Sequence, residues 1–167
     1  MLSDFAHWLR QAYAEAAKSG DTSTRVGAVL ISSEGVRLGS GCNDIYPACC
    51  DAPDRRVRPF KYKWVAHAEL VAVGEAVRRG RGGLVPGATL YASWAACADC
   101  AKAIALSGVA RLVRHVRPDG APWMNHGDWA ESAAVGDQIM RAAGVEIVDV
   151  RAVLDRTALL NGLEVRV

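Results

Sequence analysis

The fold class is decided by residues 88–116, which read ATLYASWAACADCAKAIALSGVARLVRHV. Residues 88–92 form an apolar run of strand length, and residues 97–106 have the apolar spacing of a helix that ends before Gly108. Residues 111–116 predict a second strand. Strands that alternate with helices along a chain indicate a layered α/β domain. We therefore predict an α/β fold.

The same alternation continues on both sides of this stretch. Residues 26–42 predict a β-hairpin, because two apolar runs flank a Ser-Ser-Glu-Gly turn. A helix at 128–143 followed by a strand at 145–148 predicts a parallel crossover from the strand at 111–116. Further helices are predicted at 2–18 and 66–79. No internal repeat or linker divides the chain, so we expect a single domain over residues 1–167.

The composition is that of a compact chain without an extended charged segment. Of 167 residues, 51% are hydrophobic, and 20 Lys and Arg against 18 Asp and Glu leave a net charge of +2. This balance excludes a polybasic tail and argues against nucleic acid as a partner. No apolar run approaches the ~18–20 residues that span a bilayer, and the N-terminus lacks a signal-peptide pattern. We expect a cytoplasmic protein without a membrane partner.

Five cysteines are present, and two of them form the pair Cys97-Ala98-Asp99-Cys100. In a cytosolic chain this spacing indicates metal binding or redox chemistry before it indicates a disulfide framework. A thioredoxin-like redox motif remains an alternative, because a predicted strand leads into the pair. The choice between the two depends on residues elsewhere in the chain.

His67-Ala68-Glu69 is the second motif, at the start of another predicted helix. Cys97 and Cys100 are three residues apart and share one helix face, where the first turn favours thiolates. With the His67 imidazole they make three ligands suited to tetrahedral zinc with a fourth position open. Glu69 lies roughly 200° from His67 around an ideal helix, so it is not expected to bind the metal. Its carboxylate can instead accept a proton from water and pass it to a leaving group.

These paired motifs resemble the zinc-dependent nucleobase deaminases, whose signature is a His-x-Glu followed by Cys-x-x-Cys. The resemblance covers about residues 2–148, and within it the chain looks like the bacterial and phage deoxycytidylate (dCMP) deaminases. It is carried by residues 23–29, 41–43, 58–64, 87–91, 100–105 and 108–113.

The resemblance implies a three-layer α/β/α cytidine-deaminase-like fold with a five-stranded mixed sheet whose last two strands are parallel. It implies Zn²⁺ held by His67, Cys97 and Cys100, with Glu69 as the proton shuttle. Asn43 matches the family asparagine that helps to hold the sugar and base. It also implies a homo-oligomer, either a dimer or a hexamer.

Two further residues are candidates for contact with the substrate. Ala68 lies inside the His-x-Glu motif. Trp94 can stack on a nucleobase, since bases are commonly held against aromatic faces. Packing of Trp94 against the sheet is the alternative, just as a turn role is the alternative for Asn43.

The sequence departs from the family pattern at two positions. Ala96 stands where the family has proline before the first cysteine, which predicts a modestly looser helix entry. Val71 stands where the family has asparagine, and a polar group lost beside the pocket could alter the choice of substrate.

Residues 43–63, with three prolines, predict a long irregular loop, and loops of that length usually serve a function. The loop carries a basic cluster in which at least one residue can contact a substrate phosphate. A solvated loop face is the alternative. The cluster comprises Arg55, Arg56, Arg58, Lys61 and Lys63.

Several other residues have no clear chemical role. Cys42, Cys49 and Cys50 could bind a second metal, although free thiols are the simpler interpretation. His7, His115 and His126 are interpreted as structural histidines. The apolar tail at 151–167 is expected to cover an oligomer interface or a sheet edge.

The residues together predict a zinc-dependent hydrolytic deaminase of a small-molecule cytosine nucleotide, with dCMP converted to dUMP and ammonia. One alternative keeps the chemistry and changes the substrate to a modified nucleobase or to a base in tRNA or single-stranded DNA. Another is a non-catalytic zinc-binding module on the same fold, against which the presence of Glu69 argues.

Overall fold

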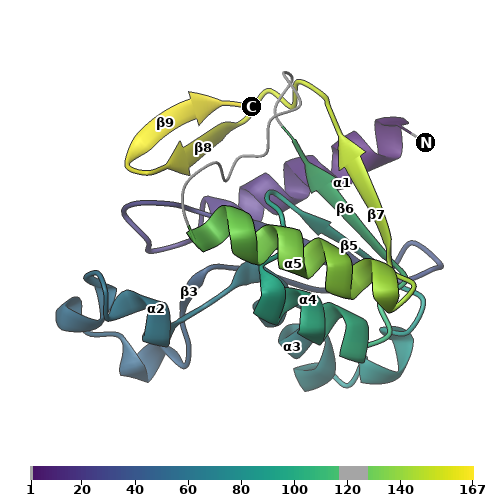
Figure 1. The fold of residues 1–167 in the computed structure, drawn as a ribbon, viewed down its shortest axis with the longest axis horizontal. Coiled ribbons are helices and arrows are strands. Elements are labelled where there is room, and N and C mark those ends of the chain that lie inside the picture. The colour runs from purple at the N-terminus through teal and green to yellow at the C-terminus, as the bar shows by residue number, and fades with distance from the viewer. Residues whose placement is uncertain (1, 117–127) are drawn as a thin grey trace.

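A computed structural model describes residues 2–116 and 128–167 of the chain. The helices are α1 (Leu2–Ala16), α2 (Lys61–Trp64), α3 (Ala68–Arg78), α4 (Ala98–Leu106) and α5 (Asp128–Ala142) (Figure 1). The strands are β1 (Gly27–Ile31), β2 (Arg37–Cys42), β3 (Asp44–Ile45), β4 (Val65–Ala66), β5 (Thr89–Ala92), β6 (Arg111–His115), β7 (Glu146–Val150), β8 (Thr157–Leu160) and β9 (Leu163–Arg166). Within these described ranges, no helix combines the length and the apolar character needed to cross a membrane.

Five of these strands form one mixed sheet in the order β2-β1-β5-β6-β7. Strand β1 pairs antiparallel with both β2 and β5, whereas β5, β6 and β7 run parallel to one another. The predicted hairpin and the parallel crossover through α5 are therefore confirmed. The predicted five-stranded mixed sheet with its last two strands parallel is confirmed as well.

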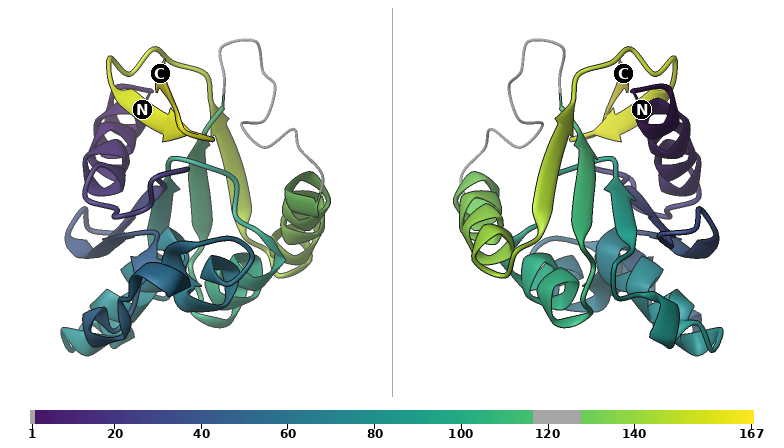
Figure 2. Two further views of the ribbon diagram at one scale, coloured as in Figure 1. Left: turned by 90° about the vertical axis from the view of Figure 1, so that its left-hand side faces the viewer. Right: turned by 90° about the vertical axis from the view of Figure 1, so that its right-hand side faces the viewer.

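Helices cover both faces of the sheet, and the alternation of side chains along β1 divides the core between them. Val29 and Ile31 pack in a cluster with α1, while Ala28 and Leu30 pack in a cluster with α3, α4 and α5. All five residues of β1 are buried because both faces are covered. Figure 2 shows α1 and α5 on opposite sides of the sheet, which is the predicted three-layer arrangement.

The C-terminal tail forms a separate two-stranded sheet, the hairpin β8–β9. Its buried side chains join the same apolar cluster as Leu9 and Tyr13 of α1. These residues are Leu154, Ala158, Leu160 and Val167. The tail therefore covers the face of the sheet that α1 covers, and it adds no strand to the sheet edge.

The prediction of a long irregular loop at 43–63 was wrong in part, because the segment contains short regular elements. Strand β3 pairs with β4 through Asp44 opposite Ala66, and two 3-10 turns and helix α2 follow β3. The segment around α2 projects away from the sheet (Figure 1). Elements of two to four residues are too short to produce a detectable hydrophobic period, which is why the sequence pattern missed them.

Glycines allow two helices to lie directly against the strands. A Cβ atom on Gly27 would lie 2.0 Å from the carbonyl oxygen of Ala12 in α1. On the other face, a Cβ on Gly39 would lie 2.2 Å from the carbonyl oxygen of Ala72 in α3. Backbone therefore packs on backbone at both points, and a side chain at either position would force the layers apart.

Candidate active site

His67, Cys97 and Cys100 come together at the N-termini of two helices. His67 is the N-cap residue of α3, Cys97 is the N-cap residue of α4, and Cys100 lies in the first turn of α4. The His67 Nδ1 atom is 3.3 Å from Cys97 Sγ and 3.4 Å from Cys100 Sγ. Within the described residues, these are the one group of histidine, cysteine and carboxylate side chains arranged to hold a metal ion.

The geometry and the charges of this group fit zinc. Tetrahedral bonds of about 2.3 Å to sulfur and about 2.0 Å to nitrogen place the ligand atoms roughly 3.6 Å apart, close to the distances found. Hydrogen bonding with Cys100 and His67 lowers the pKa of Cys97 to about 4. The same bond and burial raise the pKa of Cys100, so a dication between the sulfurs is what would hold both as thiolates. Three protein ligands leave a fourth tetrahedral position for water or substrate.

Glu69 lies beside this group without belonging to it. The side chain is buried, with the residue 4% exposed, and its Oε2 atom is 3.5 Å from Cys100 Sγ. Burial raises the pKa of its carboxyl group above the usual value. A buried carboxyl next to three metal ligands is positioned to exchange protons with a molecule bound at the metal.

A cavity of about 720 Å³ opens over the group, a size typical of small-molecule sites. One end is lined by His67, Glu69 and Cys97, and Ala68, which is fully buried, lines it too. The other end is polar and is lined by Asp21, Thr24, Arg58, Lys61 and Asn161. Among the described residues that line the cavity, nine were not named as site candidates by the sequence analysis: Asp21, Thr24, Val26, Tyr62, Val65, Ala95, Trp129, Ser132 and Asn161.

Two aromatic residues connect the ends of this cavity. The Trp129 ring lies 5.5 Å from the His67 ring and 6.0 Å from the Tyr62 ring, measured between centroids. The Tyr62 ring lies in turn 6.0 Å from the Arg58 guanidinium carbon. The wall between the candidate metal site and the cationic end is therefore aromatic, which suits a planar ring as ligand.

Helix α5 also supports the cysteine pair. The Ser132 hydroxyl accepts a hydrogen bond of 3.1 Å from the backbone N–H of Ala98. It thereby satisfies one of the free amides at the start of α4, which Cys97 does not cap with its own side chain. No signal in the sequence pairs Ser132 with a residue so distant in the chain.

Asn43 lines the cavity, but both ends of its amide are bonded to the backbone. Its Oδ1 atom accepts from Val26 N–H at 2.7 Å, and its Nδ2 atom donates to Thr24 O at 2.8 Å. The turn role left open by the sequence is therefore present, and it holds residues 24–26 at the cavity wall. Contact of Asn43 with substrate remains a prediction.

Substitution of Asn43 by alanine is expected to destabilise the fold. Two hydrogen bonds would be lost, one from the half-buried Val26 N–H and one to Thr24 O, at about 0.5–1.5 kcal/mol each, which together costs about 1–3 kcal/mol in the free energy of unfolding. Urea unfolding of the zinc-loaded protein measures this cost. If the stability is unchanged and only KM rises, the backbone contacts of Asn43 are unimportant and its role is confined to the substrate.

Trp94 also lines the cavity, and it is half-buried against the apolar cluster around α1. Part of the Trp94 ring therefore packs against the protein, as the alternative to base stacking predicted. Its buried Nε1 atom has no hydrogen-bond partner among the described residues. Stacking of the exposed part on a base remains a prediction.

The two residues that depart from the family pattern, Ala96 and Val71, are both tightly packed. Ala96 is fully buried, and its carbonyl oxygen would be 2.7 Å from a Cβ on Gly136 of α5. Val71 packs over Gly41, where a Cβ would lie 2.4 Å from the valine Cγ1 atom. Within the described residues Val71 does not line the cavity, so any effect on substrate choice would be indirect.

The five residues of the basic cluster differ in their contacts: some interact with neighbouring side chains outside the cavity, and others line the cavity. Arg56 bonds to Asp44 and Asp51, and Arg55 lies over the Trp64 ring, with its guanidinium carbon 4.0 Å from the ring centroid. Arg58 and Lys61 line the cavity, and Lys63 does not. The possible phosphate contacts are thus narrowed to two of the five basic residues.

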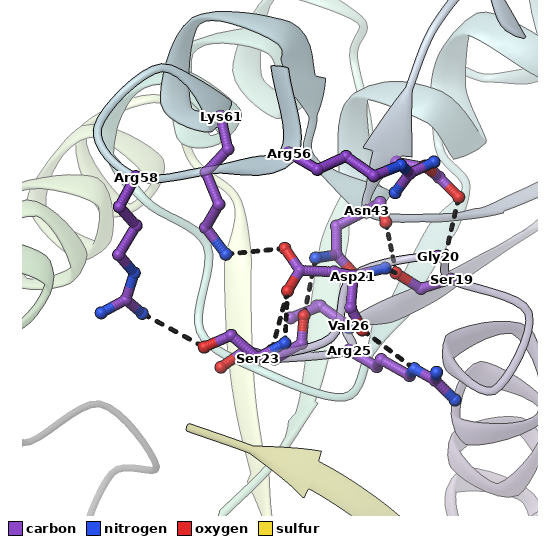
Figure 3. Close-up of polar contacts among 12 residues, drawn as sticks. Ser19, Gly20, Asp21, Ser23, Arg25, Val26, Asn43, Arg56, Arg58 and Lys61 are labelled. Atoms are coloured by element: carbon purple, nitrogen blue, oxygen red, sulfur yellow. Dashed lines mark hydrogen bonds and ion pairs between the residues drawn. The ribbon is translucent and has the colours of Figure 1, made fainter. Parts of the chain in front are cut away.

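Lys61 is buried and pairs with Asp21 at 2.8 Å. Burial alone would raise the pKa of Asp21, but hydrogen bonds from Lys61 and from two backbone N–H groups lower it below its usual value. Arg58 donates to Ser23 Oγ at 3.2 Å (Figure 3) and has no carboxylate partner among the described residues. One positive charge at this end of the cavity is therefore left for a ligand.

The remaining cysteines and histidines lie apart from the cavity wall. Cys42 is buried, Cys49 is exposed and Cys50 is half-buried, and in the described residues no metal-binding group includes them. His115 is buried, with Nδ1 2.8 Å from the Tyr13 hydroxyl and Nε2 2.9 Å from Ala152 O, as a structural histidine would be. His126 lies outside the described residues.

A mixed sheet between helical layers, with one histidine and a Cys-x-x-Cys pair meeting at two helix N-termini, defines a class of zinc-binding α/β/α proteins. Residues 3–116 match the family described as the cytidine and deoxycytidylate deaminase zinc-binding region. Because this match spans more than half of the chain, the protein belongs to that family.

Individual relatives agree with this assignment. Deoxycytidylate deaminase of Mus musculus is 30% identical over 120 residues, which cover 66% of this chain and 65% of the mouse protein. That of Enterobacteria phage T4 is 40% identical over 84 residues, covering 50% and 37%. The chain therefore spans less than two thirds of the length of either relative.

A solved structure shows the same fold. The dCMP deaminase from the cyanophage S-TIM5 in apo form superposes with a TM-score of 0.63 over 89% of this chain and 98% of the other. The two sequences are 21% identical.

Proposed function

We propose that the protein is a zinc-dependent hydrolase that deaminates a cytosine nucleotide, converting dCMP and water to dUMP and ammonia. The observation that carries this proposal is the buried carboxyl of Glu69 beside His67, Cys97 and Cys100, in the wall of a cavity. A purely structural zinc site has no use for such a carboxylate. Membership of the family and the deoxycytidylate deaminase relatives support the same conclusion.

His67, Cys97 and Cys100 would hold the zinc ion. Zinc in such a site lowers the pKa of water and so supplies a nucleophile near neutral pH. The aromatic wall formed by Tyr62 and Trp129 would position the pyrimidine ring and exclude bulk water from it.

Glu69 would carry the protons. As water adds to C4 of cytosine, the carboxylate accepts a proton and delivers it to the ring N3 atom. A second proton passes by the same route to the amino group, the C4–N bond breaks, and ammonia leaves. The distance of 3.5 Å between Glu69 Oε2 and Cys100 Sγ supports this role, because the carboxyl group lies beside one of the residues that would hold the zinc ion.

The polar end of the cavity supports a nucleotide as the substrate. Asp21 and Lys61 compensate each other, and Arg58 adds a positive charge. A phosphomonoester carries the opposite charge, and an arginine fork binds it well. A neutral nucleoside would leave this charge unused.

Substitution of Arg58 by glutamine is expected to raise the KM for dCMP about ten-fold and to leave deoxycytidine almost unaffected. A hydrogen bond to a charged group contributes about 1.5–3 kcal/mol, which corresponds to at least this factor. Lys63→Gln, which alters a neighbouring cation outside the cavity lining, is the matched control. An equal loss on both substrates would show that Arg58 does not bind the phosphate.

The proposal is tested by ammonia release from dCMP and from deoxycytidine, with Glu69→Ala as the blank. We expect turnover of dCMP well above that of deoxycytidine. If neither compound releases ammonia while zinc is bound, a modified base or a base in tRNA or single-stranded DNA becomes the favoured substrate. Turnover by Glu69→Ala would refute the mechanism, and inactivity towards every cytosine substrate would favour the non-catalytic zinc module.

The proposed activity brings further expectations. We expect residues 1–167 to act as one domain, in the cytoplasm, as a dimer or hexamer. Size-exclusion chromatography with light scattering measures the oligomeric state.

A further inference from the structure

The tip of the C-terminal hairpin borders the cavity, although it lies beyond the residues that match the family. Asn161, between β8 and β9, lines the cavity with its backbone at φ 52°. The tip is fixed to the chain at residues 23–25 by three hydrogen bonds: Arg25 N to Leu159 O at 3.0 Å, Gly162 N to Ser23 O at 2.7 Å, and Asn161 N to Thr24 Oγ1 at 3.1 Å.

The segment that the hairpin holds is also fixed from the core side. Asn43 Nδ2 donates to Thr24 O, and Lys61 Nζ donates to Asp21 Oδ2, as Figure 3 shows for Lys61. Asp21 Oδ1 in turn accepts from the backbone N–H of Ser23 and of Thr24. Residues 21–25 are thus held between the core and the hairpin, and two of them, Asp21 and Thr24, line the cavity.

The Asp21 carboxylate at this wall is paired with Lys61, and the other polar groups here include hydrogen-bond donors beside a cation. The Thr24 hydroxyl oxygen accepts from Asn161 N–H, which leaves its own proton for a ligand. The Asn161 side-chain amide supplies two further N–H donors. Arg58 bonds to Ser23 in the same segment and lines the same end of the cavity.

We propose that the C-terminal hairpin is part of the substrate site, and that the Asn161 side chain binds the terminal phosphate of the nucleotide together with Thr24 and Arg58. This inference rests on the proposed function, because it places the pyrimidine at the His67 end of the cavity. The hairpin closes the wall beyond the phosphate. A chain continuing through a phosphodiester would therefore be disfavoured, and a free mononucleotide preferred.

The test is the isosteric substitution Asn161→Asp, which adds a negative charge without changing the shape and tolerates the positive φ. We expect the KM for dCMP to rise about ten-fold, while kcat/KM for deoxycytidine changes by less than two-fold. Asn161→Gly, which keeps the backbone conformation and removes the side chain, is expected to raise the KM for dCMP about three-fold. Arg166→Gln on the same hairpin changes the net charge equally outside the cavity lining and is the control.

Calorimetric titration with dCMP tests the role of the hairpin separately from the proposed deaminase function. If the wild type binds dCMP and Asn161→Asp binds it as tightly, the role of the hairpin is overturned while the proposed function stands. The role of the hairpin is likewise overturned if Asn161→Asp lowers kcat/KM for dCMP and for deoxycytidine by the same factor. If the wild type neither binds nor deaminates dCMP, both proposals fail.

Discussion

Glu69→Gln is expected to lower kcat for dCMP about a thousand-fold while the protein keeps its zinc. Glutamine has the shape of glutamate but cannot accept and return a proton, and positioned acid–base groups contribute typically ~10²–10⁴-fold. His67, Cys97 and Cys100 remain, so the zinc content should stay at one ion per chain. Steady-state kinetics and metal analysis of the same preparation measure the two quantities.

The matched control is Glu75→Gln, the same substitution on the same helix. Glu75 bonds to Ser40 and Arg79 and lies outside the cavity lining of the described residues. We expect its kcat to stay within two-fold of the wild type. A Glu69→Gln protein that keeps a tenth or more of the activity would exclude Glu69 as the proton carrier, and loss of zinc would make it a metal-site residue instead.

Gly27→Ala is expected to reduce the free energy of unfolding by about 3 kcal/mol, at the upper end of the cost of overpacking. The new Cβ would lie 2.0 Å from Ala12 O and 2.4 Å from Ala16 N. These are backbone atoms of α1, and they cannot rotate away as a flexible side chain could. The helix must therefore move off the sheet, and Tm should fall by about 10 °C.

Gly74→Ala provides the opposite outcome in the same protein. Gly74 lies in α3, and a Cβ there would meet no atom within 4 Å apart from the neighbouring backbone of its own helix. Alanine is favoured over glycine in a helix by about 1 kcal/mol, so this variant should be more stable than the wild type. If urea unfolding ranks the two variants in the reverse order, the backbone contact at Gly27 is not what limits that position.

The elements of the layered fold could be predicted because each produces a local pattern. The buried run in β1, the helical stripe of α1 and the glycine after α4 are readable within a few residues. Strand β3 and helix α2 were missed because two to four residues give no period. The position of β3 depends on its pairing with β4, a segment distant along the chain.

The chemical end of the site was predictable for a related reason. His67, Glu69, Cys97 and Cys100 occur as two short motifs with metal-ligand spacing, so chemistry alone pairs them. Trp129, Ser132 and Asn161 carry no motif, and they reach the cavity through the packing of α5 and of the hairpin. Asn43 shows that a residue type alone does not reveal a role. Asparagine suits contact with a substrate, but this side chain is bonded to the backbone of Val26 and Thr24.

The cavity wall combines residues from two parts of the chain, one inside and one outside the range that matches the family. The residues at its reacting end lie within the part that matches the family, whereas Trp129, Ser132 and Asn161 lie after residue 116. Substitutions in the later segment can therefore change the cavity wall without replacing any of the three candidate metal ligands. In this architecture the residues at the reacting end can stay the same while the residues that contact the rest of the ligand change.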